Sequence, residues 1–201
     1  MLAGLARVIR GELAQLKLLQ MWHLVAGAVV AVAALFGGLD SVDAKPKVFN
    51  VGQPYSDGEF TVTVERATAL DDVRAGARVI MPAEPGHIYL GLVSTIRNDG
   101  PIQGSLSTGL KHAEFDLQQP RNEFLGAFRI ADASMVVLLA PKLSEKVVFL
   151  WKVPRSEVAA GSSVTLRVWQ KQLREMVVTY GKDWLASETS YAQIVVPVVK
   201  R

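Results

Sequence analysis

The stretch EFTVTVER, residues 59–66, decides the fold class, because apolar and polar side chains alternate along it. The apolar ones fall on one face of an extended chain: Phe60, Val62 and Val64. The polar ones fall on the other: Thr61, Thr63 and Glu65. Such alternation predicts a half-buried β-strand.

Four later stretches repeat the strand pattern: HIYLGLVSTI (87–96), EKVVFLWKVP (145–154), SSVTLRVWQKQ (162–172) and AQIVVPVV (192–199). The first is apolar on both faces, which is typical of a central strand. Pro197 lacks an N–H donor, so we expect the last strand at a sheet edge or a bulge. Weaker candidates lie near 48–51, 113–117, 124–130, 134–139 and 175–180. Short strands at this spacing predict a mainly β protein, with an antiparallel β-sandwich over residues 48–201.

The chain before this region is apolar and carries no charged side chain from Leu18 to Leu39. A helix over this stretch would be roughly 33 Å long, which is enough to cross a bilayer. We predict a transmembrane helix over 22–39 and a linker over 40–47. Val42-Asp43-Ala44 also fits a signal-peptidase site, so a cleaved secretory signal is the alternative. We favour a retained anchor, because the segment before the apolar run is long for the basic part of a signal.

Residues 1–21 have a helical pattern instead. Their apolar side chains recur at spacings of three and four: Leu2, Ala6, Ile9, Leu13 and Leu16. The basic side chains lie off this stripe: Arg7, Arg10 and Lys17. We predict an amphipathic helix along the cytoplasmic membrane surface, with Trp22 at the interface. One long helix over 2–38 is the alternative.

The predicted span carries small side chains on one face: Gly27, Ala31, Ala34 and Gly38. Small residues at this spacing let a second helix approach closely within lipid. The partner would be a helix of another membrane protein or of a second copy, although an Ala-rich span also produces such a stripe by chance. The basic residues before the span orient residues 40–201 to the extracytoplasmic side of the cell membrane, by the positive-inside rule.

Composition excludes several classes of function. The formal net charge is +3, of which residues 1–21 carry +2, so the remainder is nearly neutral and offers no basic surface for nucleic acid. The absence of cysteine excludes disulfides, thiolate zinc sites and cysteine nucleophiles. His87 and His112 lack metal-ligand partners at helical or hairpin spacing, and no serine stands in a Gly-x-Ser-x-Gly turn. We therefore expect no metal, no cofactor and no catalytic site, that is, a protein that is not an enzyme.

Aromatic side chains fall into two groups. Trp151 and Trp169 lie within predicted strands, where we expect them to fill the core. Three others are spread through a polar stretch that we predict to be a loop or short helix: Tyr180, Trp184 and Tyr191. Exposed aromatics often anchor interfaces, so these three form a candidate partner surface. Alternatively, they cap one end of the sandwich.

Two polar loops have simpler interpretations than ligand binding. Asn98-Asp99-Gly100-Pro101 follows the central strand, and Asn and Gly tolerate left-handed backbone, so we expect a tight structural turn there. Asp71 and Asp72 could in principle join Asp99 or Glu84 around calcium, but the spaced oxygen ligands of a calcium loop are missing.

Three segments resemble the telokin-like, immunoglobulin-fold domain family of bacterial extracytoplasmic proteins: VFNVGQPYSDGEFTVTVERA (48–67), GHIYLGLVSTIRNDGP (86–101) and LSEKVVFLWKVPRSEVAAGSSVTL (143–166). In that pattern a Val-Gly-Gln opening precedes the first strand, a Tyr-bearing central strand runs into an Asn-x-Gly turn, and a late strand ends in Val-Pro. The resemblance covers about 48–170 and implies an immunoglobulin-like sandwich, without implying an activity. The segments 70–86 and 171–201 have no counterpart, so we expect any specialised surface there.

Two functions follow as expectations. In the first, the chain is a non-enzymatic, single-pass accessory subunit, whose helices dock on an integral membrane protein such as an ABC-type transporter while the sandwich covers its outer face. In the second, the chain is a tethered or secreted module that presents the sandwich to a ligand of the cell envelope. Replacing residues 1–21 and the span with an unrelated anchor separates the two, because only the first depends on those helices.

Overall fold

The structure is a computed structural model of the 201-residue chain. It describes residues 22–23, 25–27, 29–30, 32, 46–106, 115–119, 121–159, 161–176 and 181–200. The chain divides into two compact units, Met1–Ala44 and Lys45–Arg201, and each is described by itself.

In the first unit, all the described residues are helical and lie between Trp22 and Val32. Trp22 is exposed. The predicted amphipathic helix over 1–21 and much of the predicted span over 22–39 lie outside the described residues. No helix that the structure describes is both long enough and apolar enough to cross a membrane.

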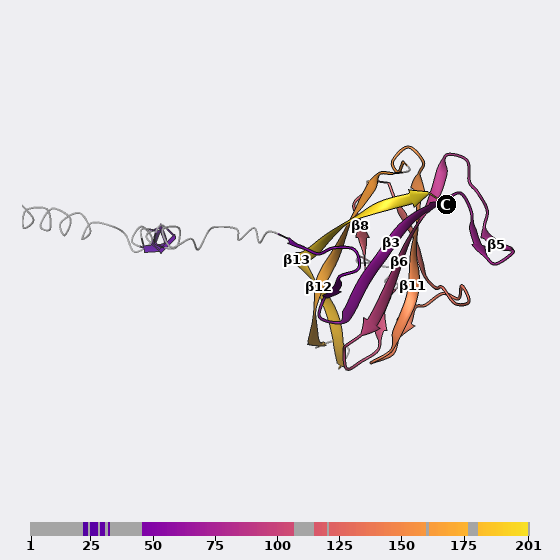
Figure 1. The fold of residues 1–201 in the computed structure, drawn as a ribbon. Helices are drawn as coiled ribbons and strands as arrows, with labels where there is room; N and C mark the ends of the chain where they lie inside the picture. Colours follow the sequence, from indigo (N-terminus) through magenta and orange to yellow (C-terminus); the bar gives the residue numbers. More distant parts are fainter. Residues whose placement is uncertain are drawn as a thin grey trace, which may run out of the picture. The chain divides into compact units, whose positions relative to one another are not determined.

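The second unit is built from strands, which confirms the prediction of a mainly β protein (Figure 1). In the part of the chain described, they are β1 (Lys47–Val48), β2 (Pro54–Ser56), β3 (Phe60–Leu70), β4 (Val73–Ala75), β5 (Arg78–Met81), β6 (His87–Asn98), β7 (Gly104–Ser105), β8 (Asp116–Leu117), β9 (Glu123–Arg129), β10 (Leu138–Leu139), β11 (Ser144–Pro154), β12 (Ser163–Met176) and β13 (Gly181–Lys200). The strands predicted from 59, 87, 145 and 162 onward correspond to β3, β6, β11 and β12.

The strands form two layers that share β13. In the first layer, here the β12 sheet, β12 pairs with β8 and β13, and β1 pairs with β13. In the second, the β6 sheet, the order is β3-β6-β11-β9, with β2 beside β3. The chain is therefore a β-sandwich, as predicted, but it is not purely antiparallel, because β13 pairs in parallel with both β1 and β3.

Pro197 lies where β13 changes partners, which differs from the predicted edge or bulge. It is the last residue of β13 in the ladder with β12, opposite Ser163, and the parallel ladder with β3 begins at Val198. Because proline cannot donate a backbone hydrogen bond, it suits a position where one ladder ends.

The core lies between the two layers and is built from the inward residues of the long strands. Its members include Phe60, Val62, Val64, Leu92, Ile96, Phe149, Trp151, Leu166 and Ile194. The predicted inward face of residues 59–66 and the predicted core position of Trp151 are thus confirmed. Burying aromatic and branched side chains on this scale is the main source of the fold's stability.

Trp169 was predicted in the core, and this prediction is wrong. The inward residues of β12 are Val164, Leu166 and Val168, so the period of two turns Trp169 to the outer face. There its ring lies 5.1 Å from the ring of Tyr191, and the guanidinium of Arg167 lies 4.8 Å from the same Tyr191 ring.

The turn after β6 is structural, as predicted, but a buried side chain holds it rather than left-handed backbone. Gly100 has no positive φ. The turn is held by the buried side chain of Asn98, whose amide donates to the carbonyl oxygens of Ile102 at 2.9 Å and Leu139 at 2.8 Å and accepts the N–H of Gly100 at 2.8 Å. Asn98 thereby ties β6 to the segment that contains β10.

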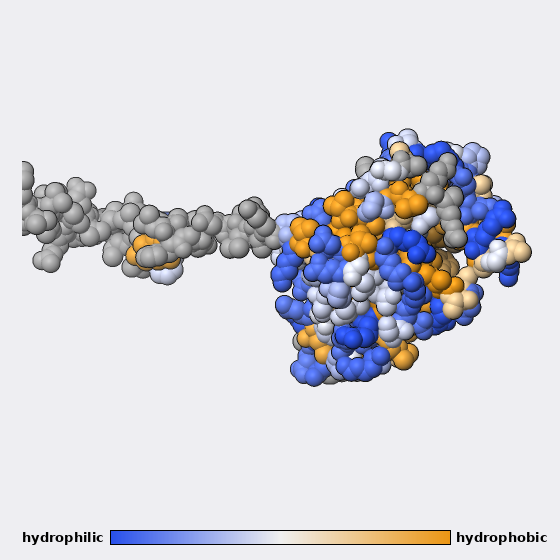
Figure 2. Space-filling model, viewed as in Figure 1, coloured by the Kyte–Doolittle hydropathy of each residue, from blue (hydrophilic) through white to orange (hydrophobic). Residues whose placement is uncertain are grey.

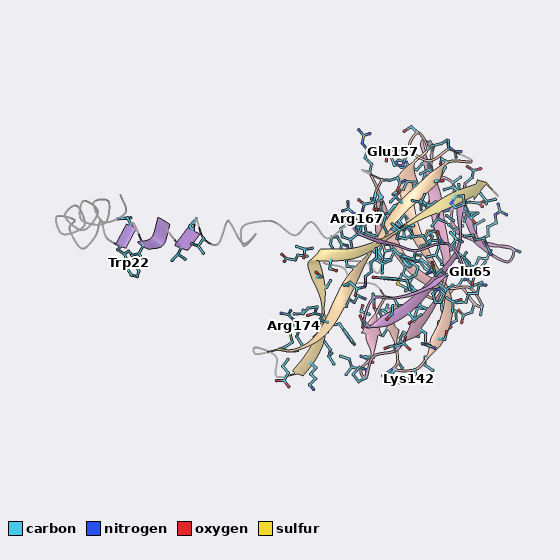
Figure 3. All side chains as sticks on the ribbon, turned by 60° about the vertical axis from the view of Figure 1, so that its left-hand side comes forward. Trp22, Glu65, Lys142, Glu157, Arg167 and Arg174 are labelled. Atoms are coloured by element: carbon cyan, nitrogen blue, oxygen red, sulfur yellow. The ribbon has the colours of Figure 1, made fainter. Side chains whose placement is uncertain are left out.

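The region from Gly181 to Tyr191 was predicted to be a loop or short helix, and it is the first half of β13. Trp184 and Leu185 pair with Leu173 and Gln172 of β12. The sequence hides this pairing because Ser187–Ser190 bulge out of the ladder between Tyr191 and Ala186, and the alternation is lost there. Beyond this bulge, Lys171–Met176 of β12 pair with Gly181–Ala186 of β13, and these two segments are here called the arm. The arm carries Arg174 (Figure 3).

Candidate binding groove

Two rows of residues run across the outer face of the β6 sheet, each with one residue from β3, β6, β11 and β9. The first row is Arg66, Val93, Val148 and Phe128. The second row is Thr68, Gly91, Leu150 and Gly126. Val93 and Leu150 are buried, although they do not belong to the core between the layers. These rows form the floor of a groove outside the sandwich.

Two glycines stand in the second row, and one of them, Gly91, lines the groove. A Cβ atom at Gly91 would lie only 3.1 Å from Cγ2 of Val148, so a side chain there would displace its neighbour and occupy the groove. Gly126, opposite Leu150 at the end of the second row, has a φ of 131°, which side chains rarely adopt.

A β-bulge in β3 turns Arg66 toward this groove. The register between β3 and β6 shifts between Val64 and Arg66, so that Glu65 is the extra residue. Val64 and Ala67 both point into the core as a result, and Arg66 joins the outer face opposite Val93. Without the bulge, the period of two would have placed Arg66 inward.

The β4–β5 hairpin forms one wall of the groove. Its strands are joined through Gly76, whose φ of 61° fits the first central position of a primed hairpin turn. Ile80 and Met81 line the groove from this hairpin, and Ile80 remains 38% exposed. Figure 2 shows exposed hydrophobic surface in orange beside the projecting hairpin at the right of the view.

The ends of the hairpin are tied to the sheet. Tyr89 of β6, which is 3% exposed, donates its hydroxyl to the carbonyl oxygen of Pro82 at 2.9 Å. Burial raises the pKa of the Tyr89 phenol, and the nearby carboxylate of Glu84 raises it further, so the hydroxyl keeps the proton that it donates. Lys152 of β11 lies 3.5 Å from Glu84, and Arg155 pairs with Asp71.

The opposite wall is the loop that follows β9. Its backbone turns back at Ala133, which has a φ of 57°, and the N–H of Arg129 donates to the carbonyl oxygen of Ser134 at 2.8 Å. The side chain of Arg129 lies 3.1 Å from Glu145 and 3.6 Å from Asp132. This hydrogen-bonded ion pair with Glu145 raises the pKa of Arg129 and holds the wall in place.

The groove between these walls is partly open to solvent and has a volume of about 1140 Å³. Its surface is largely apolar, and its apolar lining includes Leu70, Ile80, Val93, Phe128, Leu150 and Val199. Concave apolar sites with a few polar groups are the usual form of small-molecule sites, which occupy roughly 300–1,000 Å³. The groove therefore has the shape and chemistry to take an elongated apolar ligand.

The predicted helix-packing and membrane-interface residues fall mostly outside the described residues. Gly27 is helical, and a Cβ atom there would meet nothing within 4 Å among the described residues. Ala31, Ala34 and Gly38 are not described, and neither are the basic residues Arg7, Arg10 and Lys17. The structure therefore does not test the predicted packing face.

The structure places two of the three predicted surface aromatics, Trp184 and Tyr191, in different surroundings. Trp184 is half-buried, and its indole packs where a side chain at Gly100 would lie, 2.9 Å from the Cβ position. Tyr191 is half-buried against Trp169 on the outer face of the β12 sheet. Tyr180 lies outside the described residues. Trp184 thus closes one end of the sandwich, which was the alternative interpretation.

Asp57, Glu59 and Lys171 form a buried group, here the end cluster, that the sequence did not predict. The ammonium of Lys171 lies 2.9 Å from Oε2 of Glu59 and 3.4 Å from Oδ2 of Asp57. Oδ1 of Asp57 accepts the N–H groups of Glu59 and Phe60 at 2.7 and 2.6 Å. Burial raises the pKa of Glu59, while Lys171 opposes the shift. These contacts join the turn before β3 to the arm.

The carboxylates that were weighed for calcium lie beside basic side chains, with Glu84 beside Lys152 and the three aspartates beside arginines. Asp72 lies 2.7 Å from Arg74, and the hydrogen bond from Arg74 lowers the pKa of Asp72. Asp71 pairs with Arg155, and Asp99 lies 2.7 Å from Arg97. Among the described ranges, no three His, Cys, Asp or Glu residues come together as a metal site.

The groove could have been anticipated in part. The stretch 87–96 was predicted to be apolar on both faces, and a sandwich strand needs only one apolar face for the core. The segment 70–86, which has no counterpart in the family pattern and was expected to carry any specialised surface, begins at the end of β3 and provides the covering hairpin. Only the bulge at Glu65, which sets the position of Arg66, leaves no signal in the sequence.

No protein-family model and no curated protein matches this chain. One similar solved structure is an uncharacterized β-sandwich protein from Clostridium difficile, with 12% sequence identity and a TM-score of 0.48, covering 76% of this chain and 94% of that chain. This likeness is too distant to support an argument. The class of protein, a β-sandwich, therefore rests on the strand pairing, and the telokin-like, immunoglobulin-like family remains a prediction.

Proposed function

We propose that this chain is a non-enzymatic binding module, held at the cell membrane by its N-terminal helix, which takes an apolar ligand in the groove of its extracytoplasmic β-sandwich. The groove is the single observation that carries the proposal. Small sandwich proteins do not need a second apolar layer outside their core, and exposed concave apolar surface generally marks a binding site.

The predicted topology supports the same function. The apolar run that ends at Leu39 and the bases before it favour a retained anchor with the sandwich outside. The immunoglobulin-like family resemblance is consistent with a module of this kind. The docking of the helix on an integral membrane partner, or on a second copy, stays a prediction, because most of its small-residue face lies outside the described residues.

The proposal is testable because the chain has no cysteine. A cysteine introduced as Ala131→Cys, on the exposed rim of the groove, can carry an environment-sensitive fluorophore in the full chain in lipid nanodiscs. Dodecanol serves as the apolar probe. We expect a saturable spectral shift as the probe enters the groove.

A blocking variant and a matched control make the test specific. Thr68→Trp places an indole in the groove from the outer face of β3, and Thr165→Trp places one on the outer face of the β12 sheet. We expect Thr68→Trp to weaken binding by about tenfold or more and Thr165→Trp to leave it within about twofold. The absence of a saturable shift, or equal binding by both variants, would overturn the proposal.

A further inference from the structure

Arg66 differs from the other arginines that line the groove. Arg74 is paired with Asp72 at 2.7 Å, and Arg129 with Glu145 at 3.1 Å. In the part of the chain that the structure describes, no carboxylate lies within ion-pair distance of the Arg66 guanidinium. Arg66 is thus a positive charge available to a ligand.

The carboxylate next to Arg66 in the sequence is engaged elsewhere. Glu65 accepts hydrogen bonds from Lys146, whose ammonium lies 2.6 Å away, and from the hydroxyl of Thr95 at 3.1 Å. These bonds, more than the charge of Arg66, lower the pKa of Glu65. The three aspartates on the rim are likewise held by arginines: Asp71, Asp72 and Asp132. An anionic ligand group near Arg66 would therefore meet little unpaired negative charge.

The floor of the groove favours a hydrocarbon chain over a peptide. The strands β3, β6 and β11 are paired on both sides along the groove, so their backbone N–H and C=O groups are used within the sheet. A peptide lying on this floor would leave its own backbone groups without partners, which is unfavourable on an apolar surface. A hydrocarbon chain has no such groups.

The first floor row sets the size and direction of the ligand. From Arg66 the row runs through Val93 and Val148 to Phe128. With neighbouring strands separated by about 4.8 Å, this row is about 14 Å long. It has a positive charge at one end and an aromatic ring at the other.

We infer that the ligand is a single-chain fatty carboxylate, with its hydrocarbon chain across the β6 sheet and its carboxylate on Arg66. The inference rests on the proposed function and adds the chemical class of the ligand. A planar guanidinium matches a carboxylate through two parallel N–H···O hydrogen bonds, so one arginine suffices to select this head group.

The test compares three probes that differ only in their head group: dodecanoate, dodecanol and dodecylamine. The full chain in nanodiscs carries the fluorophore at Ala131→Cys, and each affinity is measured with and without Arg66→Ala. We expect dodecanoate to bind about tenfold more tightly than dodecanol, and dodecylamine to bind more weakly than either. Arg66→Ala should remove the preference, so that dodecanoate binds no more tightly than dodecanol.

Arg78→Ala is the matched control, because Arg78 is an exposed arginine of the β4–β5 hairpin that does not line the groove. It should keep the preference. If dodecanol and dodecanoate bind equally and Thr68→Trp blocks both, the inference is wrong and the proposed function stands. If no alkyl probe gives a shift that Thr68→Trp abolishes, the proposed function itself fails. Displacement of bound dodecanoate by an apolar peptide, with Arg66→Ala having no effect, would also overturn the inference.

Discussion

The end cluster and the groove differ in what they bury and what they expose to solvent. The end cluster buries two carboxylates, Asp57 and Glu59, beside the partly buried ammonium of Lys171. The groove leaves apolar side chains such as Ile80 and Val199 open to solvent on a concave surface. Burying charge and exposing apolar surface are both unfavourable, so each needs a separate reason.

The reasons differ. The buried charges hold the turn before β3 against the arm, and every member of the cluster has a partner within the chain, so the cluster is explained by structure alone. The groove gives the fold no comparable benefit, since its surface lies outside the core. We therefore assign structure to the end cluster and binding to the groove, and substitutions in each region should separate stability from affinity.

The largest expected effect is on the end cluster. Lys171→Met removes the only ammonium that contacts Asp57 and Glu59 among the described residues, and leaves two buried carboxylates without it. Breaking a buried ion pair in this way costs about 3–5 kcal/mol. Urea unfolding of the full chain should show this loss, whereas Lys182→Met on the exposed part of the arm should change the free energy of unfolding by less than about 0.5 kcal/mol. If Lys171→Met and Lys182→Met unfold at the same urea concentration, the end cluster does not stabilise the fold.

Gly100→Ala should have the next largest effect, because it tests how the arm meets the end of the sandwich. The new Cβ would lie 2.9 Å from Cζ2 of Trp184 and 3.1 Å from Oδ1 of Asn98. Overpacking of this kind costs about 1–3 kcal/mol. In a double-mutant cycle, Trp184→Leu should reduce the penalty of Gly100→Ala. Additive effects would show that Trp184 does not pack there.

Tyr89→Phe should have a smaller effect on stability and a clear effect on the groove. It removes the hydrogen bond to the Pro82 carbonyl, worth about 0.5–1.5 kcal/mol, and loosens the hairpin wall. We expect dodecanol to bind several-fold more weakly in the nanodisc assay. Tyr191→Phe, on the other sheet, should leave binding unchanged. If Tyr89→Phe binds normally, the hairpin does not depend on this contact.

The pH dependence of stability gives a still smaller signal from the end cluster. Burial raises the pKa of Glu59 above its usual value of 4.5, although Lys171 opposes the shift and Asp57 and Asp183 add to it. The folded state therefore holds this proton more tightly than the unfolded state, and the stability that the proton provides is lost as the pH rises through the folded pKa. Relative to Glu59→Gln, the unchanged chain should lose free energy of unfolding as the pH rises above the usual carboxyl pKa of 4.5. If the stability of the unchanged chain relative to Glu59→Gln stays constant or increases as the pH rises, the pKa of Glu59 is not raised in the folded state.

The sequence predicted those parts of the fold that depend on local periodicity. Phe60, Val62 and Val64 face the core because alternation holds along the first half of β3. Beyond Glu65 the bulge shifts the parity, and no property of VERATAL reveals this, so Arg66 was not predicted to face a site. Trp169 could have been placed correctly, since the alternation of Val164, Leu166 and Val168 turns it outward.

The end cluster was harder to predict for a different reason. Lys171 is separated from Asp57 and Glu59 by more than half of the chain, and only the docking of β12 on the turn at Gly58 brings them together. A Cβ atom at Gly58 would lie 2.3 Å from the carbonyl oxygen of Lys171, so glycine is needed for this approach. Such contacts follow from tertiary packing and leave no local pattern.

The smallest expected effect on stability belongs to the groove, and it is the sharpest test of the comparison. Ile80→Ser removes an apolar side chain that is 38% exposed on the hairpin, away from the core cluster. If the groove serves binding, the free energy of unfolding should change by less than about 0.5 kcal/mol, while dodecanol affinity falls several-fold. Val195→Ser, at an exposed position on the outer face of the β12 sheet, should change neither quantity by much. A large loss of stability with unchanged affinity would mean that Ile80 packs for structure, and the contrast between the two regions would then disappear.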